Sequence, residues 1–269
     1  MKKIKVLNLY AGIGGNRKLW KNVDVTAIEI NLEIAKIYQD FFPNDKVIVG
    51  DAHKYLLEHY EEFDFIWSSP PCPTHSKLRK QFIGTRCGAK PIYPDMKLYE
   101  EIIFLMHHFK GKWVVENVNS YYDPLIKPYE ISRHYYWSNF ILSKVKTNVA
   151  KFTLTNSTNK ETDEEQIERL SKELGFDVSN YEGDKRTILR NCVEPKVALE
   201  IFNCAYKFKQ LTIGGITQPS AVLTENIIGI KRVSNETPNL LTQTSLNSDI
   251  KQNFGFCSKA TIKKTETFK

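Results

Sequence analysis

An alternation of short apolar runs with segments of helical spacing fills the first half of the chain and constrains its fold more than any other feature. The apolar runs lie at residues 5–10, 23–30, 46–49, 63–68 and 113–116. Helical spacing of apolar side chains lies between them, at residues 31–42, 51–60 and 96–109. Strands that alternate with helices of about a dozen residues are typical of a parallel sheet with helices on both faces. We therefore predict an α/β fold with a Rossmann-like, doubly wound sheet.

The second half of the sequence is less regular. Residues 161–174 form an acidic amphipathic pattern that Gly175 would end, and residues 195–208 form another helical pattern that begins at a proline. A chain of 269 residues is long for one domain and short for two. We predict one main domain at residues 1–208 and a small C-terminal appendage at residues 209–269.

The composition excludes several classes of protein. Hydrophobic residues make up 41% and charged residues 26%, which disfavours a disordered chain, a collagen or a coiled coil. The five cysteines form no C-x-x-C pair, which argues against a disulfide scaffold and a structural zinc site and favours a reducing compartment. No run is long and apolar enough for a signal region or a membrane span. We expect a cytoplasmic protein with no membrane partner.

Positive charge is concentrated in the last quarter of the chain. The net charge is +7, and residues 206–269 hold nine Lys and Arg against four Asp and Glu. Such an excess suits a polyanionic partner such as nucleic acid, although a basic protein without such a partner is an open alternative.

The first candidate site is the glycine-rich segment Tyr10-Ala-Gly12-Ile-Gly14-Gly15, between a predicted strand and a helix start at residues 16–20. Glycines there allow a ligand to approach the backbone closely. Glu29 ends the second strand and Asp51 the third, where carboxylates accept from ribose hydroxyls and an adenine amine. An adenosine-containing cofactor is the favoured interpretation; a tight structural turn with capping carboxylates is the alternative.

Two further strand ends carry reactive side chains. Cys72 lies in Ser69-Pro-Pro-Cys-Pro73, where prolines hold the thiol in a rigid, extended segment suited to a nucleophile. Glu116 ends a buried apolar strand and is a candidate general acid. An inert cysteine and a turn-capping glutamate are the alternatives.

Together these segments resemble the motifs of the DNA (cytosine-5) methyltransferases, in the same order. The resembling motifs are NLYAGIGG at residues 8–15, Glu29-Ile30-Asn31, Gly50-Asp51-Ala52, SPPCP at residues 69–73 and Glu116-Asn117-Val118. Later segments also resemble the family, namely Arg133 within ISRHYYW, residues 162–176 and residues 190–195. The resemblance covers about residues 4–205 and implies a methyltransferase sheet.

The resemblance also implies a reaction. In this family the cysteine thiolate, here Cys72, adds to C6 of cytosine, and C5 then takes the methyl group of S-adenosyl-L-methionine. Glu116 would bind N3 and the exocyclic amine, and Arg133 would support the O2 side. The base must leave the duplex to reach the thiol. No metal is required.

The resemblance assigns binding residues as well. For the cofactor these are Tyr10, Ala11, Gly12, Ile13, Gly14, Glu29, Ile30, Asp51, Ala52, Pro71 and Asn191. For double-stranded DNA they are the cations that follow the nucleophile, Lys77, Arg79, Lys80 and Arg86, in a segment that closes over DNA in the family. A solvated basic loop is the alternative for these cations.

The sequence departs from the family in three places and lacks one segment. Tyr135 stands where a second arginine is expected, Pro73 where glutamine is common and Arg190 where glycine is common. Only about residues 140–160 separate the arginine motif from the next one, too few for an independent target-recognition domain. Recognition would then be minimal, lie in residues 209–269 or come from a partner chain.

These observations predict a DNA cytosine methyltransferase of bacterial or viral type, as used in DNA methylation and restriction-modification systems. An RNA (tRNA) cytosine-5 methyltransferase and a catalytically silent, cofactor-binding subunit are the alternatives. The oligomeric state is not predicted.

Overall fold

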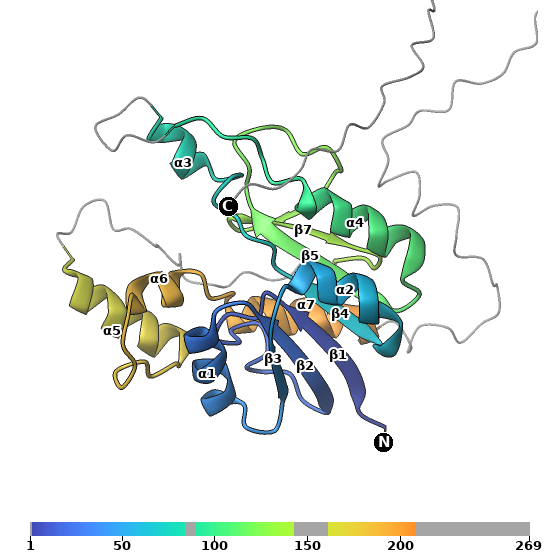
Figure 1. Ribbon diagram of the computed structural model, residues 1–269, viewed down its shortest axis with the longest axis horizontal. Coiled ribbons are helices and arrows are strands. Elements are labelled where there is room, and N and C mark those ends of the chain that lie inside the picture. The colour runs from blue at the N-terminus through green and yellow to red at the C-terminus, as the bar shows by residue number, and fades with distance from the viewer. Residues whose placement is uncertain (1, 84–89, 143–160, 208–269) are drawn as a thin grey trace, which may run out of the picture. The chain divides into compact units, whose positions relative to one another are not determined.

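The computed structural model describes residues 2–83, 90–142 and 161–207 (Figure 1). Its centre is a seven-stranded sheet with the strand order β3-β2-β1-β4-β5-β7-β6. The strands are β1 (Ile4–Leu9), β2 (Val23–Glu29), β3 (Lys46–Val49), β4 (Phe65–Ser68), β5 (Lys112–Val118), β6 (Tyr129–Ile131) and β7 (His134–Ser138). Strands β1 to β5 are parallel to their neighbours, whereas β7 runs antiparallel to both β5 and β6. The predicted α/β fold with a doubly wound sheet is confirmed.

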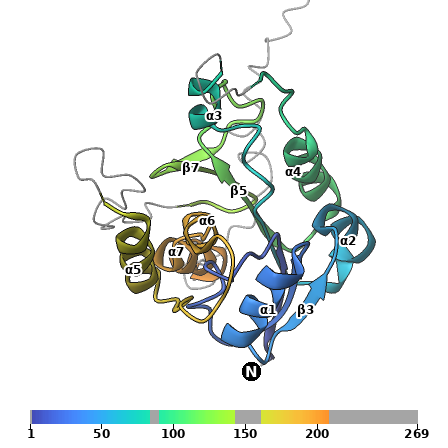
Figure 2. The ribbon, with the colours of Figure 1, turned by 60° about the vertical axis from the view of Figure 1, so that its left-hand side comes forward.

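Helices lie on both faces of this sheet, as Figure 2 shows for α2 and α4 on one side and α5, α6 and α7 on the other. The longer helices are α1 (Leu32–Phe41), α2 (Ala52–His59), α4 (Lys97–His108), α5 (Asp163–Leu174) and α7 (Pro195–Lys207). Short helical turns are α3 (Lys77–Gln81), η1 (Tyr60–Glu62) and α6 (Lys185–Arg190). Among the helices of the described ranges, none is both long and apolar enough to cross a membrane.

Each face of the sheet has its own apolar core. Trp67 and Tyr136 pack with Ile201 and Phe202 of α7 on one face. On the other face, Leu7 and Ile66 pack with Leu56 of α2 and with Ile102 of α4 in a second cluster. Successive strand residues point to opposite faces, so a strand with near-continuous apolar sequence is buried on both.

The chain turns back on itself at β1, which places β2 and β3 on one side and β4 and β5 on the other. In an open α/β sheet the loops after the two central strands diverge at such a switch point and leave a crevice for ligands. Here those loops follow β1 and β4, the strands that precede the glycine-rich segment and the SPPCP segment. The fold therefore brings the two motifs to one edge of the sheet.

The helix predicted to begin at residues 16–20 is wrong. These residues form turns, with backbone hydrogen bonds from Lys18 to Gly15 and from Trp20 to Arg17. The side-chain amide of Asn16 is held by Asn8, and the guanidinium of Arg17 donates to the carbonyl oxygen of Trp20. These side-chain bonds to local backbone and to β1 compete with a helical path.

The β6–β7 hairpin, α3 and α6 are absent from the sequence prediction. The predicted C-terminal appendage at residues 209–269 lies outside the described residues, as does most of the segment 140–160.

Candidate active site

The glycine loop, residues 10–15, turns sharply where β1 ends. Tyr10, Gly12 and Gly14 have φ values of 55°, 53° and 85°, in the left-handed region that favours glycine. A Cβ on Gly14 would lie 2.3 Å from the ring of Phe42, whereas a Cβ on Gly12 would meet nothing within 4 Å. Gly14 therefore allows close packing, and Gly12 borders open space at the edge of the sheet.

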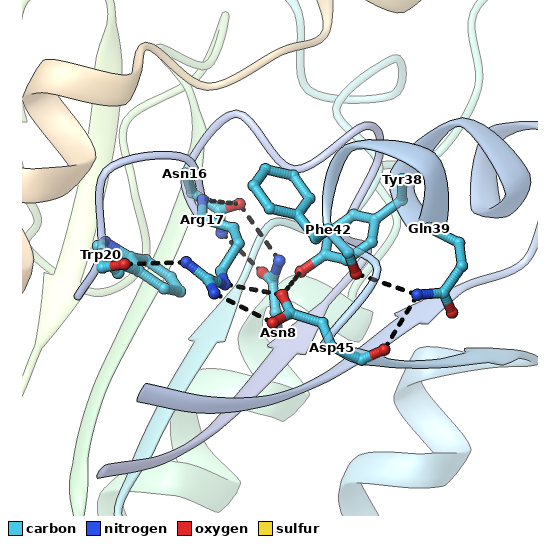
Figure 3. Close-up of polar contacts among 8 residues, drawn as sticks. All are labelled: Asn8, Asn16, Arg17, Trp20, Tyr38, Gln39, Phe42 and Asp45. Carbon is cyan, nitrogen blue, oxygen red and sulfur yellow. Dashed lines mark hydrogen bonds and ion pairs between the residues drawn. The ribbon is translucent and has the colours of Figure 1, made fainter. Parts of the chain in front are cut away.

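A buried polar network supports this loop from behind (Figure 3). Asn8 of β1 and Asn16 exchange side-chain hydrogen bonds of 3.3 and 2.6 Å. Arg17 makes a two-point ion pair with Asp45, at 2.7 and 3.0 Å, and Asp45 also accepts from the hydroxyl of Tyr38 at 2.9 Å. Paired planar groups of this kind fix orientation as well as distance. The network joins the end of the glycine loop to α1 and to the loop before β3.

Glu29, the last residue of β2, is a largely buried carboxylate at the glycine loop. Its two oxygens accept hydrogen bonds of 2.9 Å from the backbone N–H groups of Gly12 and Asn31. The next residue, Ile30, is an apolar side chain with 72% of its surface exposed. A carboxylate beside an exposed aliphatic surface offers an acceptor for a ribose and an apolar contact for a base.

Asp51 follows β3 and begins α2. Its Oδ1 accepts from the backbone N–H groups of His53 and Lys54, so Asp51 is the N-cap that the alternative interpretation expects. The side chain is exposed at the same edge of the sheet, and the adjacent Ala52 is buried against the core. Capping and ligand binding use different lone pairs of one carboxylate.

The other expected cofactor residues differ in what they expose. Ala11 and Ile13 are buried, and the side chain of Ile13 packs in a core cluster with Leu170 and Phe176. Pro71 and Asn191 are exposed, the latter at the C-terminal end of α6.

Cys72 is a half-buried free thiol in the SPPCP loop, residues 69–73, directly after β4. Its carbonyl oxygen accepts from the backbone N–H of His75, and the carbonyl oxygen of Pro70 accepts from the side chain of Asn117 at 3.0 Å. Burial, together with the carboxylate of Glu116, raises the pKa of Cys72 to about 11. The nucleophile candidate is therefore a neutral thiol at neutral pH, and the nearby negative charge of Glu116 disfavours its ionisation.

Glu116 lies within β5, two residues before its end, and only 10% of its side chain is exposed. Its Oε1 is 3.6 Å from Nε2 of His134, on the neighbouring strand β7. The strand that carries Glu116 and the SPPCP loop are joined by the bond from Asn117 to Pro70. The structure thus brings the two predicted catalytic side chains, Cys72 and Glu116, to one place.

Arg133 lies in the turn between β6 and β7, after Ser132, whose φ is 59°. Its side chain is partly exposed, and partial burial together with the neighbouring Arg190 lowers the pKa of Arg133. Within the described residues, the side chain that lies 3.6 Å from Glu116 is that of His134 rather than that of Arg133.

The predicted DNA-binding cations are only partly described. Lys77 and Lys80 are exposed on α3, and Arg79 of the same turn donates to the carbonyl oxygen of Lys90 at 3.5 Å. Arg86 lies outside the described residues. The three described cations follow the SPPCP loop directly.

Sequence reasoning missed Glu101, a carboxylate of α4 that is 1% exposed. It accepts hydrogen bonds from Tyr10 and Ser68, both at 2.6 Å, and from His53 at 3.0 Å. Burial and the neighbouring Glu101 raise the pKa of Tyr10. Glu101 therefore joins the residues after β1, at the end of β4 and in α2, which all border the candidate site.

Comparisons with known proteins give a match for residues 4–124. This stretch matches the family model described as C-5 cytosine-specific DNA methylase. No match is found among curated protein sequences.

The solved structures that resemble the chain are similar only in part. The Entamoeba histolytica methyltransferase EhMeth is 12% identical over 77% of this chain and 99% of that one, with a TM-score of 0.44. A mutant of DNMT2 from Spodoptera frugiperda is 25% identical over 43% of this chain and 36% of that one, with a TM-score of 0.29. The putative methyltransferase yhhF from Escherichia coli is 16% identical over 50% and 74%, with a TM-score of 0.34.

The matched stretch spans β1 to β5 and includes the glycine loop, Glu29, Asp51, Cys72 and Glu116. Over residues 4–124, less than half of its length, the chain is therefore similar to the C-5 cytosine-specific DNA methylases.

Proposed function

We propose that this protein transfers a methyl group from S-adenosyl-L-methionine to C5 of a cytosine in double-stranded DNA, through a covalent bond to Cys72. The observation that carries the proposal is the meeting of Cys72 and Glu116 at the crevice edge, where the charge of Glu116 acts on the thiol. Asn117 joins their two segments by its bond to Pro70. The family match supports the same chemistry.

The residues at the glycine loop fit the cofactor. Gly12 borders open space, Glu29 presents a carboxylate, and the exposed surfaces of Ile30 and Asp51 offer an apolar face and an acceptor for an adenine ring. When bound, S-adenosyl-L-methionine supplies an electrophilic methyl group. In this role Glu29 binds the ribose, and Asp51 accepts from the adenine amine.

Glu116 controls the reactivity of the nucleophile in this proposal. The thiol of Cys72, with a pKa of about 11, is protonated in the free protein at neutral pH. A protonated Glu116 that donates to N3 of cytosine no longer carries the negative charge that disfavours a thiolate. Arrival of the base therefore makes the thiol easier to ionise, and the thiol proton leaves to solvent.

The bonding changes then follow from the two side chains. The thiolate forms an S–C6 bond, the C5=C6 electron pair shifts toward C4, and N3 takes the proton of Glu116. The ring is now an enamine whose C5 would take the methyl group from the sulfonium sulfur of S-adenosyl-L-methionine, with S-adenosyl-L-homocysteine as the leaving group. Loss of the C5 proton to a base, return of the N3 proton to Glu116 and departure of the Cys72 thiolate from C6 restore the aromatic ring.

Double-stranded DNA as the substrate is proposed from the family match and from the cations of α3. Lys77, Arg79 and Lys80 lie directly after the SPPCP loop, where they can contact phosphates without reading sequence. Because C6 of a stacked base is out of reach of a thiol, the target cytosine must be extruded, at a cost of a few kcal/mol.

The test is methyl transfer from tritiated S-adenosyl-L-methionine to mixed-sequence duplex DNA, with a parallel tRNA arm. We expect label in DNA that appears as 5-methylcytosine after digestion to nucleosides, and none with the Cys72→Ser variant. Binding of the cofactor by that variant should stay intact, because the glycine loop is untouched. Label in tRNA alone, or no label in either acid while the cofactor binds, contradicts the proposal.

A further inference from the structure

His134 and Glu116 face one another from neighbouring strands. In the antiparallel pair of β5 and β7, Tyr136 lies opposite Glu116 and His134 lies opposite Val118. Residues directly opposite each other point to the same face, as do residues two apart on one strand. The register therefore places His134 on the face of the sheet that carries the Glu116 side chain.

The two side chains are near one another but do not form a hydrogen bond. Nε2 of His134 lies 3.6 Å from Oε1 of Glu116, which is beyond hydrogen-bond length. The carboxyl group is 10% exposed, whereas the imidazole is 36% exposed. The imidazole is therefore the more exposed member of the pair, and in the tautomer with the proton on Nε2 it could donate to a ligand that reaches Glu116.

We propose that His134 is a further catalytic residue, which donates a hydrogen bond to O2 of the cytosine that Glu116 holds. This inference rests on the proposed function and adds a contact to it.

The chemistry of the base requires a donor at this position. The edge of cytosine presents an amine donor, the N3 acceptor and the O2 acceptor in a row. A protonated Glu116 matches the first two, with one oxygen as acceptor and one O–H as donor. The third group must be a donor beside the carboxyl oxygen that serves N3, and Nε2 of His134 lies beside Oε1. Uracil presents an acceptor and a donor where cytosine has its amine and N3, so it does not match this row.

Arg133, which the family resemblance assigns to the O2 side, is less well placed for that contact. It lies in the turn before β7, and its near charged neighbour is Arg190 of α6. The arginine at 133 and the histidine at 134 therefore have separable roles that single substitutions can distinguish.

A donor at O2 acts mainly on the reaction step. As the thiolate of Cys72 adds to C6, negative charge develops on N3 and, through C2, on O2. Donors positioned where charge develops lower the barrier, and loss of one such donor reduces kcat by about 10²-fold. We expect His134→Ala to lose about 10²-fold in kcat, with a much smaller change in KM for DNA.

The experiment compares wild type, His134→Ala, His134→Arg and Arg133→Ala in methyl transfer to mixed-sequence duplex DNA. The arginine variant should recover part of the lost kcat, because a guanidinium supplies N–H donors on the same strand position. Thermal unfolding and cofactor binding check that each variant is folded. Full activity in His134→Ala, or a larger loss of kcat in Arg133→Ala, overturns the inference.

A second substrate tests the contact itself. Duplex DNA made with 2-thiodeoxycytidine carries sulfur, a weaker acceptor, in place of O2. It should slow the wild type, yet add little to the defect of His134→Ala, because interacting groups are not additive. Equal slowing of both proteins overturns the inference. Absence of transfer by the wild type to any DNA overturns the proposed function, and this inference with it, whereas the former outcomes overturn this inference alone.

Discussion

The side-chain amide of Asn117 donates a hydrogen bond to the carbonyl oxygen of Pro70 at 3.0 Å, across 47 residues of sequence. One partner belongs to the strand that carries Glu116 and the other to the loop that carries Cys72. The bond is buried, so its loss leaves the carbonyl group of Pro70 without a partner and loosens the nucleophile relative to the acid.

Asn117→Ala should therefore be less stable and less active. A buried acceptor left unsatisfied lowers the free energy of unfolding by about 1–3 kcal/mol. We expect kcat to fall more than affinity for the cofactor, because the glycine loop does not contact this bond. Urea unfolding and single-turnover methyl transfer measure the two effects. Asn44→Ala, at an exposed asparagine, is the matched control; equal behaviour of the two variants would contradict the assignment.

Glu116→Gln should make the thiol of Cys72 more reactive while abolishing methyl transfer. The carboxylate raises the pKa of Cys72, so its removal lowers that pKa from about 11 and increases the thiolate fraction at pH 8. Alkylation of Cys72 by iodoacetamide, followed by peptide mass spectrometry, should be several-fold faster than in wild type. Glu130→Gln, at an exposed glutamate of the neighbouring hairpin, should leave the rate unchanged. A slower rate in Glu116→Gln would show that the charge acts in the opposite sense.

Alanine at Gly12 and at Gly14 should have different consequences. Both positions have positive φ, which costs an alanine about 1–2 kcal/mol. At Gly14 the new methyl group would also meet Phe42 and Tyr38, adding about 1–3 kcal/mol of destabilisation. At Gly12 it enters open space, so that variant should stay folded and bind S-adenosyl-L-methionine more weakly. Unfolding curves and calorimetric titration distinguish them; unchanged cofactor affinity in Gly12→Ala would place the cofactor elsewhere.

His53 should make the loops around the site more stable in acid. Its hydrogen bond with Glu101 raises the pKa of His53 above the usual value near 6.5. Because the pKa of His53 is higher in the folded than in the unfolded protein, its contribution to the free energy of unfolding is complete below the unfolded pKa of about 6.5. This contribution declines as the pH rises through the folded pKa. The stability difference between wild type and His53→Gln should therefore shrink from pH 6 upward in urea unfolding. His107→Gln, at an exposed histidine of α4, should show no such trend. A difference that grows with pH would contradict this assignment.

The parallel half of the sheet could be predicted because each strand there is a separate apolar run, and β1, β3 and β4 are closely followed by glycine or proline. The hairpin of β6 and β7 could not, because β6 has three residues and the aromatic residues of β7 carry no alternation that stands out. The predicted helix after the glycine loop failed for a different reason. The partners that hold Asn16 and Arg17, namely Asn8 and Asp45, are distant in sequence, and their contacts override local preference.

In the site, too, some residues could be predicted from local sequence patterns and others could not. Cys72 and most of the expected cofactor residues lie at or just after strand ends, which sequence patterns locate, whereas Glu116, expected at a strand end, lies two residues before the end of β5. His134 could not be found in this way, because its relation to Glu116 depends on the register of a hairpin that the pattern does not reveal. For Glu101 the sequence held one indication, a carboxylate on the apolar side of a helix. Its three hydrogen-bond donors come from other segments, so the sequence could not reveal them.

That shared carboxylate has a thermodynamic consequence. Tyr10 belongs to the glycine loop and Ser68 leads into the SPPCP loop, yet both donate to Glu101. If a ligand orders one of these loops, the other loop has less conformational entropy left to lose when it binds its own ligand. Linkage requires the effect to be mutual, so under the proposed function the cofactor and the base would each strengthen binding of the other by the same factor.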